Sequence, residues 1–169
     1  MKKTIVRSVF LFLVYILQSS IFSFLSIRGI KPDFLLAAVI AVALQSSDIE
    51  GGIYGLFFGL LQDFHTGYIL GINAISKFIT GYLTGYYTRI LFRSDVLLPF
   101  IVTFVGSILH EGITIIIMHF IQFSHPFLPL MWKLVLPYAF LNSVICVFIY
   151  NILRKIEASF FKHEGVIGR

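Results

Sequence analysis

The chain has 169 residues, of which 58% are hydrophobic and only 12% are charged, and its formal net charge is +5. A soluble globular domain carries roughly 25% charged residues, so this composition excludes a water-soluble domain and indicates an all-α integral membrane protein. At about 20 residues per span, five or six helices fit the length as one transmembrane domain, residues 1–169.

Six apolar runs follow one another along the chain. The first has a basic start but about 20 apolar residues and no A-x-A-like cleavage site, so we interpret it as a retained span and not a signal peptide. The second and third are only about 13 residues, ~20 Å, against a hydrocarbon core of ~30 Å, so a short hairpin and a five-span count stay open. The predicted spans lie near residues 5–27, 34–46, 51–63, 71–92, 96–122 and 133–153, and residues 154–169 form a short cytoplasmic tail.

The placement of basic residues favours six spans. With a cytoplasmic N-terminus, six spans put nine Lys and Arg residues on the inner side and three on the outer side, which satisfies the positive-inside rule. Five spans would put one basic terminus outside. We therefore expect both termini in the cytoplasm. The inner residues are Lys2, Lys3, Arg7, Arg89, Arg93, Arg154, Lys155, Lys162 and Arg169, and the outer ones are Arg28, Lys31 and Lys133.

Small residues recur at helical spacing on the third and fourth spans. Residues four apart share one ridge of a helix, and the two spans run antiparallel through a short loop, so the ridges can face each other. Small side chains let membrane helices approach closely. The sequence therefore predicts a packing seam in which Gly55 and Gly59 lie near Gly81 and Gly85. The members of the seam are Gly51, Gly55, Gly59, Gly81 and Gly85.

Each ridge also carries a charged residue. In the predicted register, Asp63 and Lys77 meet near the outer surface, where they form a structural ion pair. The alternative is that both charges bind a ligand.

A second group of polar residues is predicted near the middle of the last two spans. His110 and Glu111 lie on the fifth span and Asn142 on the sixth. An ionisable residue inside a membrane is a functional-site hypothesis by default. The structural alternatives are that Glu111 is protonated or hydrogen-bonded to Asn142 or Lys77, or that it faces a helix of a partner protein.

Catalytic motifs are missing from the sequence. His110-Glu111 begins like H-E-x-x-H, but Thr114 stands where the second histidine is required. His110 and His119 are nine residues apart, ~180° round a helix, and cannot share a metal. Phosphate-binding, nucleophile-elbow and dinucleotide motifs do not occur. The sequence does not indicate an enzyme, and we expect no cofactor and no metal.

Four segments between residues 32 and 85 resemble the rod shape-determining protein MreD family. They are Pro32-Asp33 before an aliphatic run, Gly51-x3-Gly55-x3-Gly59-Leu60-Leu61-Gln62-Asp63, Leu70-Gly71-x-Asn73-Ala74, and Gly81-Tyr82-x2-Gly85. The family motif includes Pro32, Asp33, Gly71 and Asn73. Length, six-span layout and basic ends also fit this family.

The resemblance implies a non-catalytic, multi-pass scaffold in the bacterial cytoplasmic (inner) membrane. Such proteins act in cell elongation, rod-shape determination and peptidoglycan synthesis. The implied direct partner is MreC, and through it MreB, RodA and a class B penicillin-binding protein. The lipid bilayer is a further expected partner, and no nucleic acid is expected. Whether the protein forms a homodimer stays open.

The resemblance also implies a fold. It is a six-helix bundle resembling the substrate-binding S component of energy-coupling-factor transporters. The alternative function is therefore that of a vitamin-uptake subunit whose outward-facing pocket uses the neighbourhood of Lys77, Glu111 and Asn142. A lipid-modifying membrane enzyme is a third alternative.

The predicted topology is testable by cysteine labelling in intact cells. Probes at positions 2 and 165 should be shielded from impermeant reagents, because both termini are expected inside. A probe at position 124, in the longest outer loop, should react. Labelling of the C-terminal probe would contradict the six-span topology.

Overall fold

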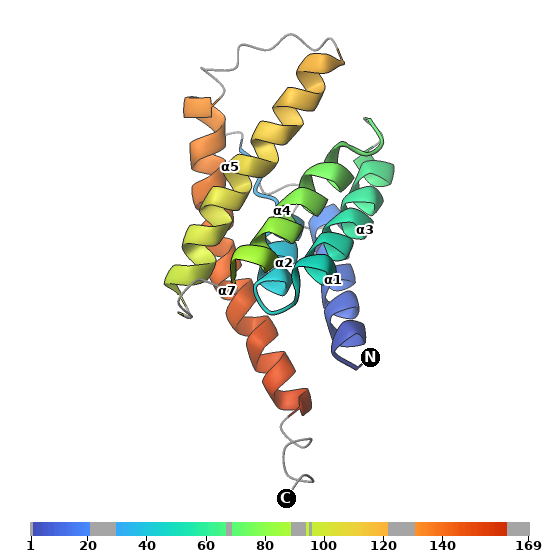
Figure 1. Ribbon diagram of the computed structural model, residues 1–169, viewed down its shortest axis with the longest axis vertical. Coiled ribbons are helices and arrows are strands. Elements are labelled where there is room, and N and C mark those ends of the chain that lie inside the picture. Colours follow the sequence, from blue (N-terminus) through green and yellow to red (C-terminus); the bar gives the residue numbers. More distant parts are fainter. Residues whose placement is uncertain are drawn as a thin grey trace, which may run out of the picture.

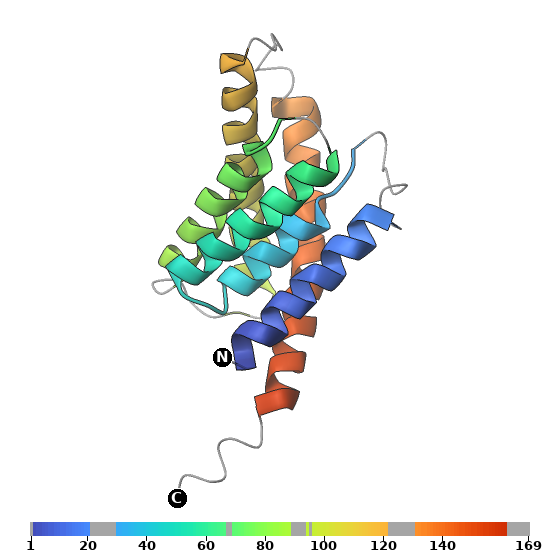
Figure 2. The same cartoon turned by 90° about the vertical axis from the view of Figure 1, so that its right-hand side faces the viewer.

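A short apolar helix lies at the centre of the structure, a computed structural model that describes residues 2–20, 30–66, 69–88, 94, 96–121 and 131–161. This helix, α2 (Phe34–Ala43), contacts the five other α-helices that the described residues form. These are α1 (Lys2–Ser20), α3 (Asp48–Thr66), α4 (Ile72–Thr88), α5 (Leu97–Phe120) and α7 (Leu136–Phe161), the last preceded by the π-helical segment η2 (Met131–Val135). In this part of the chain the fold is all-helical (Figures 1 and 2).

The composition of α2 explains its position. Every residue of Leu35–Ala43 is aliphatic and 0% exposed. A helix that is apolar all round is buried on all sides. One face packs against α1 and α3, around Leu11, Val39 and Phe58, and the other packs against α5 and α7, around Ile40 and Cys146.

Each predicted span contains one helix in the described residues, with different bounds. Helix α2 has ten residues, ~15 Å long, so it is too short to cross a ~30 Å hydrocarbon core alone. Helix α7 continues through residues 154–161 of the predicted tail. The predicted ends at 21–27 and 89–92 and the tail beyond residue 161 lie outside the described residues.

Within the described residues, three helical stretches are long and apolar enough, by length and composition, to cross a membrane. They are Lys2–Ser20, Leu97–Phe120 and Lys133–Phe160. No more than a third of each stretch is buried inside the bundle, so large apolar side chains cover its outer surface. Exposed apolar surface of this extent suits contact with lipid. The protein is therefore a membrane protein.

Helices α3 and α4 pack more extensively against each other than any other pair in the described structure. The five predicted seam glycines all lie on this contact. A Cβ atom on Gly59 would lie 2.5 Å from the Asn73 carbonyl oxygen, and one on Gly51 would lie 2.6 Å from the Gly81 oxygen. Such positions admit only glycine unless the backbones separate.

The register of this contact differs from the predicted one. Gly55 and Gly59 were expected near Gly81 and Gly85, but they lie against Lys77 and Asn73. Gly59 thus faces a residue eight positions, about two turns, before Gly81. The four-residue spacing of the glycines identifies the helix faces that pack. The register depends on the geometry of the turn between α3 and α4.

A buried arginine joins the helices at the end of the bundle that holds both chain termini. Arg7 on α1 is 6% exposed, and it donates to Glu157 Oε1 on α7 at 2.7 Å, to Glu50 Oε2 on α3 at 3.1 Å and to the Gln45 carbonyl at 2.6 Å. The sequence suggested only an inner-surface charge for Arg7. The Arg7 cluster shows instead that one side chain ties three helices and the α2–α3 connection together.

Substituting a seam glycine should destabilise the protein, and the chain offers a matched control. Gly59→Ala places a methyl group against the Asn73 backbone, and such overpacking costs about 1–3 kcal/mol of unfolding free energy. Gly112→Ala on α5 meets no atom within 4 Å and should be neutral or slightly stabilising, because alanine favours helix more than glycine. Unfolding in detergent micelles measures both. Equal stability of the two variants would show that α3 and α4 do not pack this closely.

Candidate functional site

The polar site begins at the N-terminus of α2. Asp33 is the N-cap, and its Oδ1 accepts from the Leu36 N–H at 2.9 Å, so the helix starts where Pro32-Asp33 predicts. Its own N–H donates to Asn142 Oδ1 on α7 at 2.9 Å. The Asp33 carboxylate thus accepts a hydrogen bond from an N–H group of the first helical turn through Oδ1, and its Oδ2 is left for another donor.

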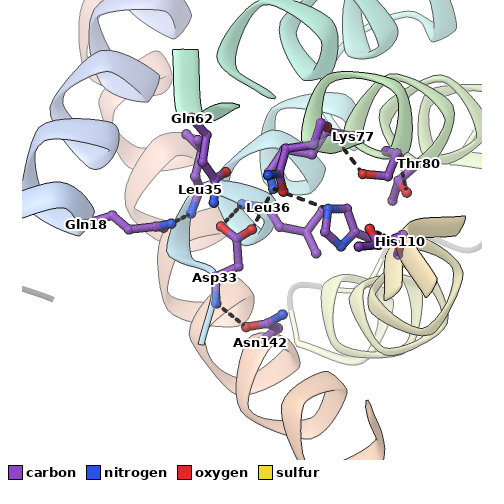
Figure 3. A network of polar contacts seen from close by, with 12 residues as sticks. Gln18, Asp33, Leu35, Leu36, Gln62, Lys77, Thr80, His110 and Asn142 are labelled. Carbon is purple, nitrogen blue, oxygen red and sulfur yellow. Dashed lines mark hydrogen bonds and ion pairs between the residues drawn. The ribbon is translucent and has the colours of Figure 1, made fainter. Parts of the chain in front are cut away.

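That donor is the side chain of Lys77, which is 0% exposed. Its Nζ donates to Asp33 Oδ2 at 2.6 Å, to His110 Nε2 at 3.3 Å and to Asn73 Oδ1 at 3.5 Å. Figure 3 shows Asp33 and His110 converging on this ammonium. An ammonium has three hydrogens, so each has an acceptor in the protein. A buried charge is tolerated under these conditions of pairing and hydrogen bonding.

His110 takes a defined orientation in this arrangement. Because Nε2 accepts from Lys77, the ring proton belongs on Nδ1, which faces Glu111 Oε1 at 3.6 Å. The Glu111 side chain keeps 28% exposure, in contrast to the 3% of His110. Asn142 completes the site from α7 by donating to Ser107 Oγ on α5 at 3.2 Å.

The structure therefore brings together His110, Asn142 and Lys77, with Glu111 at the edge of the group. We call the set of Asp33, Asn73, Lys77, Ser107, His110 and Asn142 the Lys77 network. It connects the start of α2 with α4, α5 and α7. The pairing of Asp33 with Lys77 was not predicted, because the two residues are 44 positions apart and belong to different helices.

The predicted ion pair between Asp63 and Lys77 is wrong. Asp63 caps α4 instead: its carboxylate accepts from the N–H groups of Gly71 at 2.9 Å, Asn73 at 3.1 Å and Ala74 at 3.1 Å, and from Asn73 Nδ2 at 2.9 Å. A helix N-terminus offers unpaired N–H groups and a positive partial charge, so it attracts the Asp63 carboxylate in the last turn of α3. Asn73 links the two residues, because it contacts both Asp63 and Lys77.

This cap also fixes the α3–α4 register. The turn passes through Gly71 at φ +102°, a left-handed conformation that glycine adopts without strain. Since Asp63 must reach the first turn of α4, the glycines of α3 meet α4 two turns earlier than predicted. The family-motif residues Gly71 and Asn73 thus have structural positions in the turn and the cap.

A cavity of about 350 Å³ lies beside the Lys77 network. Its walls come from the C-terminal halves of α1, α3 and α5 and from the beginnings of α2, α4 and α7. Successive helices run in opposite directions, so these parts lie away from the end of the bundle that holds the chain termini (Figures 1 and 2). Asp33, His110 and Glu111 line the cavity, whereas Lys77 and Asn142 lie behind its wall.

Comparison with known proteins identifies the family. The model of a family described as the rod shape-determining protein MreD matches residues 1–156, nearly the whole chain. The chain belongs to the MreD family. No curated protein and no solved structure matches it. Membership gives the protein a role in rod-shape determination, and the MreD family is a structural membrane protein family.

The ion pair at the centre of the site can be tested by a double-mutant cycle. Asp33→Asn keeps an N-cap but leaves Lys77 without its anion, and Lys77→Met leaves Asp33 without its cation. Each should lower the unfolding free energy by about 3–5 kcal/mol, because an uncompensated buried charge remains. The double variant should lose less than the sum of the two, since neither charge is left.

The matched cycle uses Asp63→Asn with Lys77→Met. Asp63 caps α4 and is connected to Lys77 only through Asn73, so coupling between these two substitutions should be much weaker than coupling between Asp33 and Lys77. Strong coupling in this cycle, together with additivity between Asp33 and Lys77, would contradict the observed pairing.

Proposed function

We propose that this protein is a non-catalytic scaffold of the bacterial cell-elongation machinery and that it acts through direct binding of MreC. MreB, RodA and a class B penicillin-binding protein would join through that complex and so link the protein to peptidoglycan synthesis. The observation that carries the proposal is that buried charged and polar side chains at the centre of the bundle bond to other groups of the same chain. Asp33, Lys77 and Asn142 each bond to groups on other helices of the same bundle.

The charge distribution supports a multi-pass protein of the inner membrane with both termini in the cytoplasm. Lys2, Lys3, Arg154 and Lys155 lie towards the end of the bundle that holds the termini. Lys31 and Lys133 lie at the opposite end, next to the beginnings of α2 and α7. Because cytoplasmic segments carry the excess of basic residues, the end with the termini is assigned to the inside.

A scaffold needs a rigid arrangement of lipid-facing helices to present to its partners. The Lys77 network ties α2, α4, α5 and α7 together at one end, and the Arg7 cluster ties α1, α3 and α7 together at the other. Directional hydrogen bonds between buried polar groups favour one arrangement of helices over alternatives. We propose that this bundle shares the helical layout of a transporter S component and that MreC docks on its lipid-facing helices.

The alternative function of vitamin uptake would use the same region of the bundle. It requires Lys77, Glu111 and Asn142 to face a ligand. Lys77 and Asn142 are 0% exposed and bonded within the protein, and of these three residues only Glu111, at 28% side-chain exposure, lines the cavity. This distribution favours the scaffold over uptake.

The two functions separate in living cells. In a rod-shaped host that depends on this protein, Asp33→Asn and Lys77→Met should each give rounded cells and little MreC in co-purification, because the loss is a large fraction of a typical protein's stability. The double variant should recover part of both. His119→Gln, at an exposed position on α5, should match the wild type.

Growth of a vitamin auxotroph provides the opposing measurement. A scaffold gives the same growth in all five strains at limiting vitamin. Normal rods with normal MreC recovery, together with growth that fails only when the vitamin is scarce, would replace the scaffold by an uptake subunit.

A further inference from the structure

The cavity beside the Lys77 network is lined by polar residues in a bundle whose centre is otherwise aliphatic. Thirteen of its fourteen lining residues carry a polar group in their side chains, and Pro32 is the exception. Most of these groups already have partners in the protein. The Tyr15 hydroxyl donates to the Leu61 carbonyl, and Thr114 Oγ1 donates to the His110 carbonyl. The polar groups without a partner in the protein indicate what kind of ligand the cavity can bind.

Two buried polar atoms on the cavity lack a hydrogen-bond partner. They are Gln62 Oε1, an acceptor, and His110 Nδ1, which is a donor because Nε2 accepts from Lys77. The His110 side chain is 3% exposed, and its nearest carboxylate oxygen is 3.6 Å away, beyond hydrogen-bond distance. In Figure 3, Gln62 and His110 flank the Asp33–Lys77 pair. Leaving a buried polar atom unpaired costs about 1–3 kcal/mol, so we expect each of the two atoms to bind either an ordered water or a polar group of a ligand.

The cavity also presents one charge of each sign. Asp33 is neutralised by Lys77, which leaves Glu111 as the acidic group inside the cavity. Among the described residues, the ion-pair partner of Glu111 within 4.0 Å is the His110 ring, which is neutral in this arrangement. Lys31 lines the same cavity and is exposed to solvent, so it places a cation at the rim.

We propose that this cavity binds a compact zwitterion. Its ammonium group donates to Glu111 and Gln62, and its anionic group accepts from His110 Nδ1–H and pairs with Lys31. A volume of about 350 Å³ lies at the lower end of the range for ligand sites, which limits the ligand to a small molecule or a headgroup. The inference goes beyond the scaffold function and does not depend on it.

Two sources share this chemistry. One is a free amino acid or a phosphorylated amino alcohol, and the other is the headgroup of an aminophospholipid such as phosphatidylethanolamine. Both carry an ammonium with N–H donors a few bonds from an oxyanion. A choline headgroup has the same charges but no N–H, so it is the matched control ligand.

Calorimetric titration of the full-length protein in lipid-free micelles tests the free ligands. O-phosphoethanolamine and L-alanine are the probes, and O-phosphocholine is the control. Nanodiscs of phosphatidylglycerol with either phosphatidylethanolamine or phosphatidylcholine test the lipid source through the midpoint of thermal unfolding. Binding of the free probes assigns a soluble zwitterion, and stabilisation only in phosphatidylethanolamine assigns the headgroup.

Variants connect binding with the named residues. Glu111→Gln should weaken binding of the ammonium ligand about ten- to hundredfold, the size of a hydrogen bond to a charged group. Lys31→Gln, at the exposed rim, should weaken it about two- to fivefold and should leave the bundle intact, because the position is exposed. His119→Gln lies outside the cavity and should bind as the wild type does.

The proposal is overturned by any of three results. One is that neither the free probes nor phosphatidylethanolamine bind the wild-type protein, in which case water alone satisfies Gln62 and His110. The second is that choline and ethanolamine compounds act equally. The third is that Glu111→Gln and Lys31→Gln, folded as judged by unfolding midpoint, bind as tightly as His119→Gln. These outcomes leave the scaffold function untouched, because that rests on cell shape and MreC recovery.

Discussion

The buried pair of Lys77 and Asp33 is the interaction on which the arrangement of this bundle depends. The ammonium is out of contact with solvent, and its three acceptors come from the start of α2, from α4 itself and from α5. A pair of this kind contributes little net stability, but removing one member leaves a charge with no compensation. It therefore selects one relative position of three helices. Gly55 lies against the backbone carbonyl of Lys77, so close packing of α3 also determines where the lysine can reach.

The Lys77 network and the Arg7 cluster join the helices at opposite ends of the bundle. Between the Lys77 network and the Arg7 cluster lies α2, in which every residue from Leu35 to Ala43 is aliphatic. Apolar contact gives no net drive for association in lipid, where tails are as apolar as leucine. Directional bonds at both ends supply the orientation that aliphatic packing lacks. The glycines of α3 and α4 add close backbone contact along the side.

The sequence predicted the class of the protein, the existence of its helices and the packing faces of α3 and α4. It did not predict register or long-range pairing. Asp63 and Lys77 were paired because they are close along one hairpin, but the N–H groups of α4 bind Asp63, and Asp33 on another helix binds Lys77. Arg7 was counted among surface charges, although its partner Glu157 lies 150 positions away. Periodicity describes one helix at a time, so contacts among several helices require the fold.

The position of α2 has a consequence for biosynthesis. Its cap is completed by Asn142, which is made 109 residues after Asp33. At about 5–20 residues per second, the chain needs roughly 5–20 s to reach that point. During this interval the ten-residue helix is too short to cross the bilayer alone, and Asp33 and Lys77 await their remaining partners on α5 and α7. The centre of the finished protein is thus synthesised early and completed last, and a ribosome that stops before α7 leaves a chain whose core helix has no complete cap.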